Sequence, residues 1–250
     1  MAQLTVLITG CSEGGIGHSL ALEFARQNYH VFATARNDSK MSSMSGNLNV
    51  TLLELDVISP KSIQTAVEAV SNATNGSLNI LYHNAGVLQS LWRSTATGTW
   101  LNGHSGQTSS LWWNLTRVFM PLILNSGAGS KIVFSNSVAA VAPIPTQVLY
   151  DASKAALDMY TKVLRLEARP LGVHVVNVMT GEVGTTTAEQ TLEKLPEGSP
   201  YESIASIINK SWTTRKTVML VGKYSAQAVA KISQKNPPRQ LWLGGNATTV

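Results

Sequence analysis

The chain is poor in charge and in cysteine, and it has no long apolar run. Only 13% of its 250 residues are charged whereas 44% are hydrophobic, a balance typical of globular rather than disordered chains. The single cysteine, Cys11, excludes an internal disulfide and favours a reducing compartment. No apolar stretch approaches the roughly 18 residues of a spanning helix, and the first residues are typical of a strand rather than a secretory leader. We therefore expect a cytoplasmic protein, and peripheral association with a membrane or a lipid droplet stays open.

The amount and distribution of charge indicate which classes of binding partner to expect. The net charge of +5 is modest for this length, and lysine and arginine form no clustered tracts, so we expect no nucleic-acid partner. A slight basic excess fits either an ordinary solvated surface or a pocket for a phosphorylated cofactor. We expect no metal site. A chain of 250 residues can bury one sizeable core, and we expect a single domain over residues 1–250.

Apolar runs typical of strands alternate with helical patterns along the chain. The expected strands span residues 4–9, 30–35, 50–55, 78–82, 131–135, 173–178 and 240–243. Expected helices span residues 16–27 and 149–168, and another begins at Pro60 with Ser59 as its N-cap. This alternation predicts an α/β fold, with a doubly wound parallel sheet and helices on both of its faces. Residues 185–216 are weakly patterned and could form a small helical lid over a substrate.

A glycine-rich segment lies between the first expected strand and the first expected helix. It reads Thr-Gly-Cys-Ser-Glu-Gly-Gly-Ile-Gly over residues 9–17. Glycines allow a tight turn and let backbone N–H groups approach a pyrophosphate at the positive end of a helix. An ordinary glycine-rich turn is the alternative, but the strand before it and the helix after it favour dinucleotide binding. The cofactor-binding residues expected here are Gly10, Ser12, Gly15, Ile16 and Gly17.

Three residues at other strand ends extend this hypothesis. Arg36 ends the second strand, where an arginine suits the 2′-phosphate of NADP and a carboxylate would suit the ribose of NAD. Asp56 follows the third strand, and its carboxylate could equally reach an adenine amino group or form an Asx turn at the helix start. Asn84, in Asn-Ala-Gly after the fourth strand, could tie neighbouring strands together while the small residues pack against the cofactor; a plain turn is the alternative.

The strongest signal is Tyr150 with Lys154, together with Ser137 upstream. Four residues apart on a helix, Tyr150 and Lys154 share one face. A free tyrosine has a pKa of about 10, and a neighbouring ammonium beside a cationic nicotinamide should lower that pKa and allow proton transfer near neutral pH. Ser137 could then donate a hydrogen bond to the substrate oxygen. A half-buried tyrosine and a solvated lysine are the alternative, but the accompanying motifs in this order make coincidence a poor explanation.

These motifs together resemble the short-chain dehydrogenase/reductase family over residues 4–185. The resemblance is carried by the glycine turn, Leu-Asp-Val at 55–57, Asn-Ala-Gly at 84–86, and Ser137 thirteen residues before Tyr150. It implies a Rossmann-type sheet of about seven parallel strands and an NADP(H)-dependent oxidoreductase that transfers hydride between the nicotinamide and a carbonyl or alcohol. It also implies that Tyr150 is the acid–base and that Lys154 holds the nicotinamide ribose as well.

A second part of the resemblance concerns the segment after the sixth strand. Thr-Gly at 180–181 stands where the family has Pro-Gly, which implies that Val183 and Thr185 face the nicotinamide carboxamide. A finer resemblance is to fungal NADPH-dependent 1-acyldihydroxyacetone-phosphate reductase-like proteins, carried by the glycine turn, Ala-Thr-Ala-Arg at 33–36 and Asn-Pro-Pro-Arg at 236–239. The small-molecule substrate implied is a similar lipid ketone or a ketone of fungal secondary metabolism.

Residues 87–115 depart from the family pattern. The family has a helix there with an Asn-x-x-Gly pattern, whose asparagine completes the catalytic tetrad and positions a proton-relay water. Counting back from Pro121 puts Thr108 near that position, whereas Asn102 and Asn114 lie at other spacings. The stretch could be a diverged substrate loop or a frame or splice error in the gene sequence. The alternative function is therefore a catalytically impaired NADP-binding or partner-binding protein with an altered segment at 88–113.

The helix expected over residues 149–168 carries an apolar stripe. Members of the family commonly pair long helices, so the resemblance implies a homodimer or a tetramer. The alternative is that this stripe simply packs in the core.

Overall fold

The computed structural model describes residues 3–86, 105–143, 147–185, 202–204, 206–207 and 218–248, and for residues 105–111 the backbone alone. The strands are β1 (Thr5–Thr9), β2 (His30–Ala35), β3 (Val50–Glu54), β4 (Ile80–His83), β5 (Lys131–Ser137), β6 (His174–Thr180), β7 (Val183–Gly184), β8 (Met219–Leu220) and β9 (Gln240–Leu243). Seven of them form one sheet in the order β3-β2-β1-β4-β5-β6-β9, in which every neighbouring pair is parallel. The expected seven-stranded parallel sheet is thereby confirmed.

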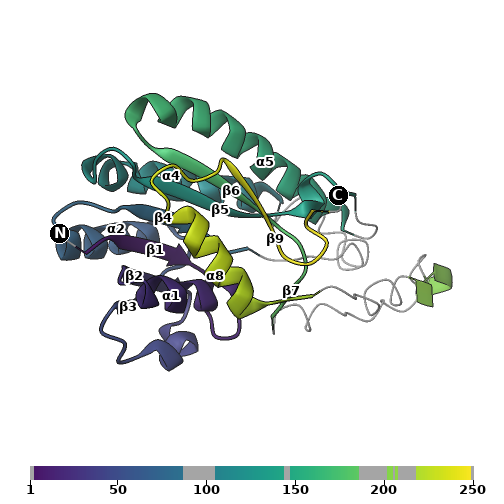
Figure 1. Ribbon diagram of the computed structural model, residues 1–250, viewed down its shortest axis with the longest axis horizontal. Helices are drawn as coiled ribbons and strands as arrows, with labels where there is room; N and C mark the ends of the chain where they lie inside the picture. Colours follow the sequence, from purple (N-terminus) through teal and green to yellow (C-terminus); the bar gives the residue numbers. More distant parts are fainter. Residues whose placement is uncertain are drawn as a thin grey trace.

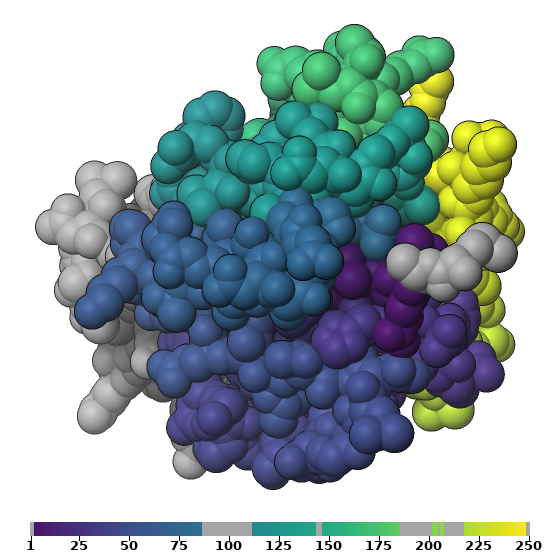
Figure 2. Space-filling view, turned by 90° about the vertical axis from the view of Figure 1, so that its left-hand side faces the viewer, coloured from purple at the N-terminus to yellow at the C-terminus, as the bar shows by residue number. Residues whose placement is uncertain are grey.

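Helices cover both faces of this sheet (Figure 1). The helices are α1 (Ile16–Arg26), α2 (Pro60–Thr74), α4 (Ser105–Asn125), α5 (Val148–Ala168) and α8 (Val221–Ile232). Helices α1 and α8 pack on one face, and α2, α4 and α5 pack on the other. From the side, the blue, teal and green that mark α2, α4 and α5 succeed one another across the molecule (Figure 2).

Burial on both faces explains why the central strands are almost entirely apolar. In β1, Val6 and Ile8 belong to the core beneath α1 and α8, whereas Leu7 belongs to the core beneath α2, α4 and α5. All three side chains are completely buried, as the alternation of side chains along a strand requires. The sheet is therefore a rigid platform whose strand ends can hold side chains at fixed positions.

Most of the elements expected from the sequence form within one or two residues of their predicted ends. The N-cap of α2 is confirmed, because the Ser59 side chain accepts a hydrogen bond from the backbone N–H of Ser62 and Pro60 opens the helix. A short 3₁₀ helix, η1 (Asp38–Met44), lies between β2 and β3. Helix α8 and the small parallel ribbon of β7 and β8 had no sequence prediction.

The segment that departs from the family pattern is helical from Ser105 onward, because α4 begins there. The lid expected over residues 185–216 lies mostly outside the described residues, with Thr185, 202–204 and 206–207 as its described parts. Among the helices that the structure describes, none is both long and apolar enough to cross a membrane.

Candidate active site

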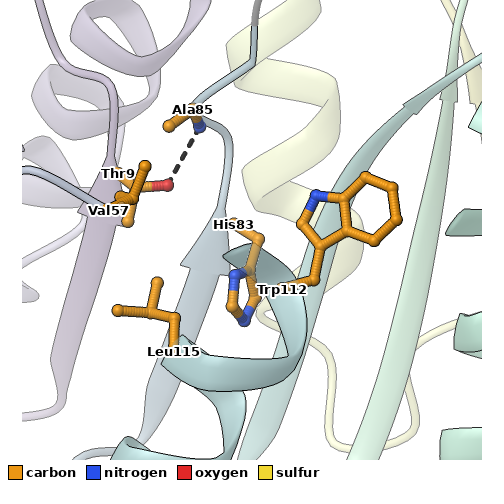
Figure 3. Close-up of a pocket in the computed structure, with 6 residues that line it drawn as sticks. All are labelled: Thr9, Val57, His83, Ala85, Trp112 and Leu115. Carbon is orange, nitrogen blue, oxygen red and sulfur yellow. Dashed lines mark hydrogen bonds between the residues drawn. The ribbon is translucent and has the colours of Figure 1, made fainter. Parts of the chain in front are cut away.

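The strand order reverses between β1 and β4, because the chain builds outward from β1 on one side and from β4 on the other. In open parallel sheets such a reversal leaves a crevice beyond the carboxyl ends of the strands, where ligands bind. A small pocket lies at this position (Figure 3), and its lining residues are Thr9, Val57, His83, Ala85, Trp112 and Leu115. They come from β1, the segment after β3, the end of β4, and α4.

The glycine turn between β1 and α1 is shaped by contacts that only glycine permits. Gly10 and Gly14 have φ angles of 75° and 76°, in the left-handed region that L side chains rarely adopt. A Cβ on Gly10 would lie 2.9 Å from the Cα of Ala85, and one on Gly17 would collide with the carbonyl oxygen of Gly10. The turn therefore packs backbone against backbone.

The geometry of this turn fits the pyrophosphate of a dinucleotide. Helix α1 begins at Ile16 after Gly15, and no side chain caps its first turn. The first N–H groups of a helix have no partner within the helix and carry a partial positive charge, which suits a bound anion. Ser12 is half-buried in the same turn. The contacts of the expected turn residues with a cofactor stay predictions.

Thr9 joins the glycine turn to the Asn-Ala-Gly turn that follows β4. Its hydroxyl oxygen accepts hydrogen bonds from the backbone N–H groups of Asn84 and Ala85, both at 2.9 Å. Figure 3 shows the bond to Ala85. The Asn84 amide nitrogen donates to the carbonyl oxygens of Thr9 at 3.0 Å and Gly10 at 3.2 Å. Asn84 thus ties the strands together as its sequence context indicated, and its contact with a cofactor stays a prediction.

Arg36 is exposed directly after β2, at the rim of the same strand ends. The backbone N–H of Glu13, in the glycine turn, donates to the Lys40 carbonyl oxygen at 2.9 Å and so holds η1 beside this turn. The structure therefore places the backbone of a second basic residue, Lys40, against the glycine turn. Lys40 could not be found from the sequence, because a lone lysine between two strands carries no positional signal.

Asp56 forms an Asx turn, which is one of the two roles that the sequence allowed for it. Its carboxylate accepts a hydrogen bond from the backbone N–H of Ile58 at 3.2 Å, which makes an Asx turn before α2. The hydroxyl oxygen of Ser62 accepts a hydrogen bond from the Asp56 backbone N–H at 2.9 Å. A contact between Asp56 and adenine stays a prediction.

Ser137, Tyr150 and Lys154 meet at the ends of β5 and α5. Ser137 is the last residue of β5, and its hydroxyl oxygen accepts a hydrogen bond from the backbone N–H of Ala139 at 3.2 Å. Tyr150 and Lys154 lie in the first two turns of α5, and the Lys154 ammonium is 5.5 Å from the centre of the Tyr150 ring. A Cβ on Gly86 would be 4.0 Å from the Lys154 nitrogen, so this group faces the Asn-Ala-Gly turn.

The pKa of Tyr150 is governed chiefly by burial. Burial raises the pKa of Tyr150 above its ordinary value, a hydrogen bond with Ser137 lowers it, and the charge of Asp151 raises it again. Desolvation of the phenolate is thus the largest effect on this pKa, and the lowering expected from Lys154 beside a cationic nicotinamide stays a prediction. Tyr150 therefore keeps its proton at neutral pH.

Lys154 is held in a poorly solvated position with a neutral partner. Its ammonium donates to the backbone carbonyl oxygen of Ser135 at 3.1 Å. Burial lowers the pKa of Lys154 to about 8, because a charge that is removed from water is disfavoured. The group is therefore still mostly cationic at neutral pH, and it loses its charge in mildly alkaline solution.

His83 lines the pocket, but it is no acid–base candidate. Its ring stacks on Phe134 with centroids 4.5 Å apart and planes 3° apart, and its Nε2 lies 3.1 Å from the Thr116 hydroxyl. Burial lowers the pKa of His83 to about 3, so the ring is neutral at physiological pH. In Figure 3 the ring lies between Trp112 and Leu115, where it packs α4 against β4.

The segment after β6 is fixed by the residues that follow β9. The backbone groups of Glu182 and Gly245 exchange two hydrogen bonds, and the Gly181 N–H donates to the Leu243 carbonyl oxygen at 2.8 Å. A Cβ on Gly181 would collide with the Gly245 carbonyl oxygen. Val183, in β7, is buried and Thr185 is half-buried. Their contact with a carboxamide stays a prediction.

The position expected for a fourth catalytic residue is only partly visible. Asn102 lies outside the described residues, and of Thr108 only the backbone is described. Asn114 is half-buried in the third turn of α4. Within the described parts of the chain, no group of three or more metal-binding side chains occurs.

Comparisons with known proteins give a consistent result. The family model for short chain dehydrogenase matches residues 4–196. "Short-chain dehydrogenase PC-15" of Penicillium crustosum is 40% identical over 203 residues, which cover 80% of this chain and 73% of the relative. "NADPH-dependent 1-acyldihydroxyacetone phosphate reductase" of Schizosaccharomyces pombe is 31% identical over 261 residues, which cover 97% and 86%.

Solved structures share the fold. A short-chain dehydrogenase from Streptomyces avermitilis has a TM-score of 0.82 at 23% identity, covering 100% of this chain and 90% of that one. The L-sorbose reductase from Gluconobacter frateurii, solved with NADPH and L-sorbose, has a TM-score of 0.77 at 22% identity, covering 96% and 94%. At such low identity these likenesses concern the fold alone.

The buried ammonium gives a testable stability prediction. Replacing Lys154 with methionine should raise the melting temperature near pH 7 by several degrees, since roughly 2–4 °C corresponds to each kcal/mol in a chain of this size. The pKa of Lys154 in the folded chain, about 8, lies below the ordinary lysine value of 10.5 that applies in the unfolded chain. The unfolded chain thus binds more protons between these values, wild-type stability rises with pH there, and the advantage of Lys154→Met should shrink.

Calorimetry at pH 7 and at about pH 10.5 would measure both effects. Lys61→Met is the matched control, because Lys61 is exposed on α2 and its replacement removes no buried charge. A Lys154→Met chain that melts no higher than the wild type at pH 7 would contradict the prediction.

Proposed function

The chain belongs to the short-chain dehydrogenase family, and from this membership we propose that it is an NADP(H)-dependent oxidoreductase acting on a carbonyl or alcohol. The observation that carries the proposal is the meeting of Ser137, Tyr150 and Lys154 beside the Asn-Ala-Gly turn at the strand-order reversal. The NADPH-dependent relative from Schizosaccharomyces pombe supports the choice of cofactor. One domain would hold both the cofactor and the substrate.

The cofactor would lie across the carboxyl ends of the strands. The turn residues Gly10, Ser12, Gly15, Ile16 and Gly17 would hold the pyrophosphate. The phosphorylated ribose would lie toward the exposed Arg36, with Lys40 nearby, because a guanidinium binds phosphate oxygens in pairs.

The opposite end of the cofactor would lie at the catalytic side chains. Asp56 and Asn84 would flank the adenine half, and Val183 and Thr185 would face the carboxamide. Lys154 would hold the nicotinamide ribose. When bound, the nicotinamide supplies or accepts the hydride.

The chain's own residues would move the proton. Ser137 would donate a hydrogen bond to the substrate oxygen and so hold it beside Tyr150. Because burial keeps the Tyr150 hydroxyl protonated at neutral pH, this group is ready to give a proton to an oxygen that gains negative charge. The Lys154 cation would stabilise the phenolate that remains. In this protonation state Tyr150 can serve as the acid when a carbonyl is reduced.

The substrate class rests on the relatives. We propose a ketone, either a lipid ketone like the acyldihydroxyacetone phosphate in the name of the yeast relative or a ketone of fungal secondary metabolism. The alternative, a catalytically impaired binding protein, has less support, because the three catalytic side chains are present in one place.

We also propose that the protein is a homodimer or a tetramer paired through α5. Four apolar side chains on α5 are about half or more exposed, and their spacing puts them on one helix face: Val148, Met159, Val163 and Leu166. Trp113, on the neighbouring α4, is 57% exposed. Part of the predicted stripe therefore faces outward rather than into the core, and pairing would remove it from water.

The catalytic assignment predicts that Tyr150→Phe loses turnover but keeps the cofactor. Removing a general acid should lower kcat by about 100-fold or more, whereas NADPH affinity should change by less than about threefold. NADPH oxidation would be followed with a 1-acyldihydroxyacetone phosphate and with polyketide and terpenoid ketones, and binding by NADPH fluorescence. Tyr160→Phe is the control, since it removes another buried hydroxyl from α5. A wild type that binds NADPH but reduces none of these ketones would favour the binding-protein alternative.

The cofactor assignment predicts that Arg36→Asp shifts preference from NADPH toward NADH. Loss of charge-assisted bonds to the 2′-phosphate should weaken NADPH binding about 10- to 100-fold, while the new carboxylate can accept bonds from a ribose hydroxyl. Titrations with both cofactors would measure the ratio, with Arg169→Asp, an exposed arginine after α5, as the control. An unchanged ratio would remove Arg36 from the site.

Pairing through α5 predicts a particle larger than one 26.8 kDa chain. Light scattering after gel filtration should give two or four chains for the wild type and one chain for Leu166→Arg, because a buried, unpaired charge opposes association. Leu48→Arg, at a leucine that is 96% exposed away from α5, should leave the mass unchanged. A monomeric wild type would contradict the proposal.

A further inference from the structure

Ser135 contacts both halves of the proposed site with two different groups. It lies on β5 two residues before Ser137 and is half-buried. Its backbone carbonyl oxygen accepts the hydrogen bond from the Lys154 ammonium at 3.1 Å. Its hydroxyl donates to the side-chain oxygen of Asn84, also at 3.1 Å.

Asn84 carries this connection on to the glycine turn. Its amide nitrogen donates to the carbonyl oxygens of Thr9 and Gly10, as described above. A continuous series of hydrogen bonds therefore runs from the Lys154 ammonium through Ser135 and Asn84 to the start of the turn. These residues come from α5, β5, the end of β4 and β1, so the series crosses the strand-order reversal.

The other group near the Ser135 hydroxyl is the phenol of Tyr82. Tyr82 is completely buried, and its phenol interacts with the Ser135 hydroxyl and with Tyr224. The Ser135 hydroxyl nevertheless donates its hydrogen bond to the Asn84 side-chain oxygen. Because the Asn84 amide nitrogen donates to Thr9 and Gly10, both ends of this amide are bonded.

We propose that Ser135 is a positioning residue that fixes Lys154 relative to the glycine turn. The inference rests on the proposed function, since it assigns Lys154 to the nicotinamide ribose and the turn to the pyrophosphate. A lysine has a flexible four-carbon stem, and an anchored carbonyl acceptor limits where its ammonium can lie. The serine hydroxyl secures that anchor to the turn, so the two ends of the cofactor site keep one spacing.

The test compares a whole cofactor with a fragment of it. NADPH reaches both ends of the proposed site, whereas 2′,5′-ADP lacks the nicotinamide and its ribose and reaches the turn alone. Ser135→Ala removes the hydroxyl and keeps the carbonyl. NADPH affinity should fall about 3- to 10-fold, the range of one hydrogen bond, whereas 2′,5′-ADP affinity should stay within about twofold. Fluorescence and calorimetric titrations would measure the two affinities.

Two further variants separate the hydroxyl from packing. Ser135→Thr keeps the hydroxyl and should restore NADPH affinity to within about twofold of the wild type. Ser130→Ala removes another buried serine hydroxyl, just before β5, and should leave both affinities unchanged, because Ser130 is outside the series of bonds.

Three results would overturn the inference while leaving the proposed function intact. They are equal NADPH binding by Ser135→Ala and the wild type, an equal loss for NADPH and 2′,5′-ADP, and a loss that Ser135→Thr does not restore. A wild-type chain that binds no NADPH would instead remove the proposed function, and the inference with it.

Discussion

The approach of two backbone turns, one at Gly10 and the other at Ala85, is the constraint on which the site depends. Each turn follows a central strand, and Thr9 and Asn84 hold the two together with four hydrogen bonds. Glycine at position 10 permits this approach, since a Cβ there would lie 2.9 Å from the Ala85 Cα. The first turn then leads directly into the start of α1. A wider gap would separate the helix terminus from the side chains of α5, and the crevice would no longer hold one extended ligand.

Burial is the largest influence on the charge states of the two proposed catalytic side chains, Tyr150 and Lys154. Tyr150 keeps its proton because the phenolate would be poorly solvated, and Lys154 is a weaker base than usual for the same reason. Each group therefore depends on what enters the crevice for its final charge state. For Tyr150, desolvation is therefore the largest effect on the pKa. Desolvation acts on both groups at once.

The fold and much of the site could be predicted from the sequence because strand ends carry strong local signals. Alternating apolar runs located the seven strands, and Thr9, Gly10, Ser137 and Tyr150 lie at the ends of the elements expected for them. Asp56 was undecided because its Asx turn depends on the helix start, and Lys40 was missed because a loop brings it to the turn. His83 and Ser135 gave no signal either, since their roles depend on partners distant in sequence.

The backbone hydrogen bonds between the segment after β6 and the end of β9 have a consequence for folding during synthesis. Gly181 and Glu182 obtain their backbone partners from Leu243 and Gly245, which are synthesised much later than the rest of the crevice. Contacts between residues so far apart in sequence form late and slowly, because the intervening chain must first be ordered. On the ribosome, the glycine turn and α5 would therefore be synthesised before the residues that hold the segment after β6 in place. The segment after β6 would obtain its backbone partners only once β9 and the residues that follow it have been synthesised.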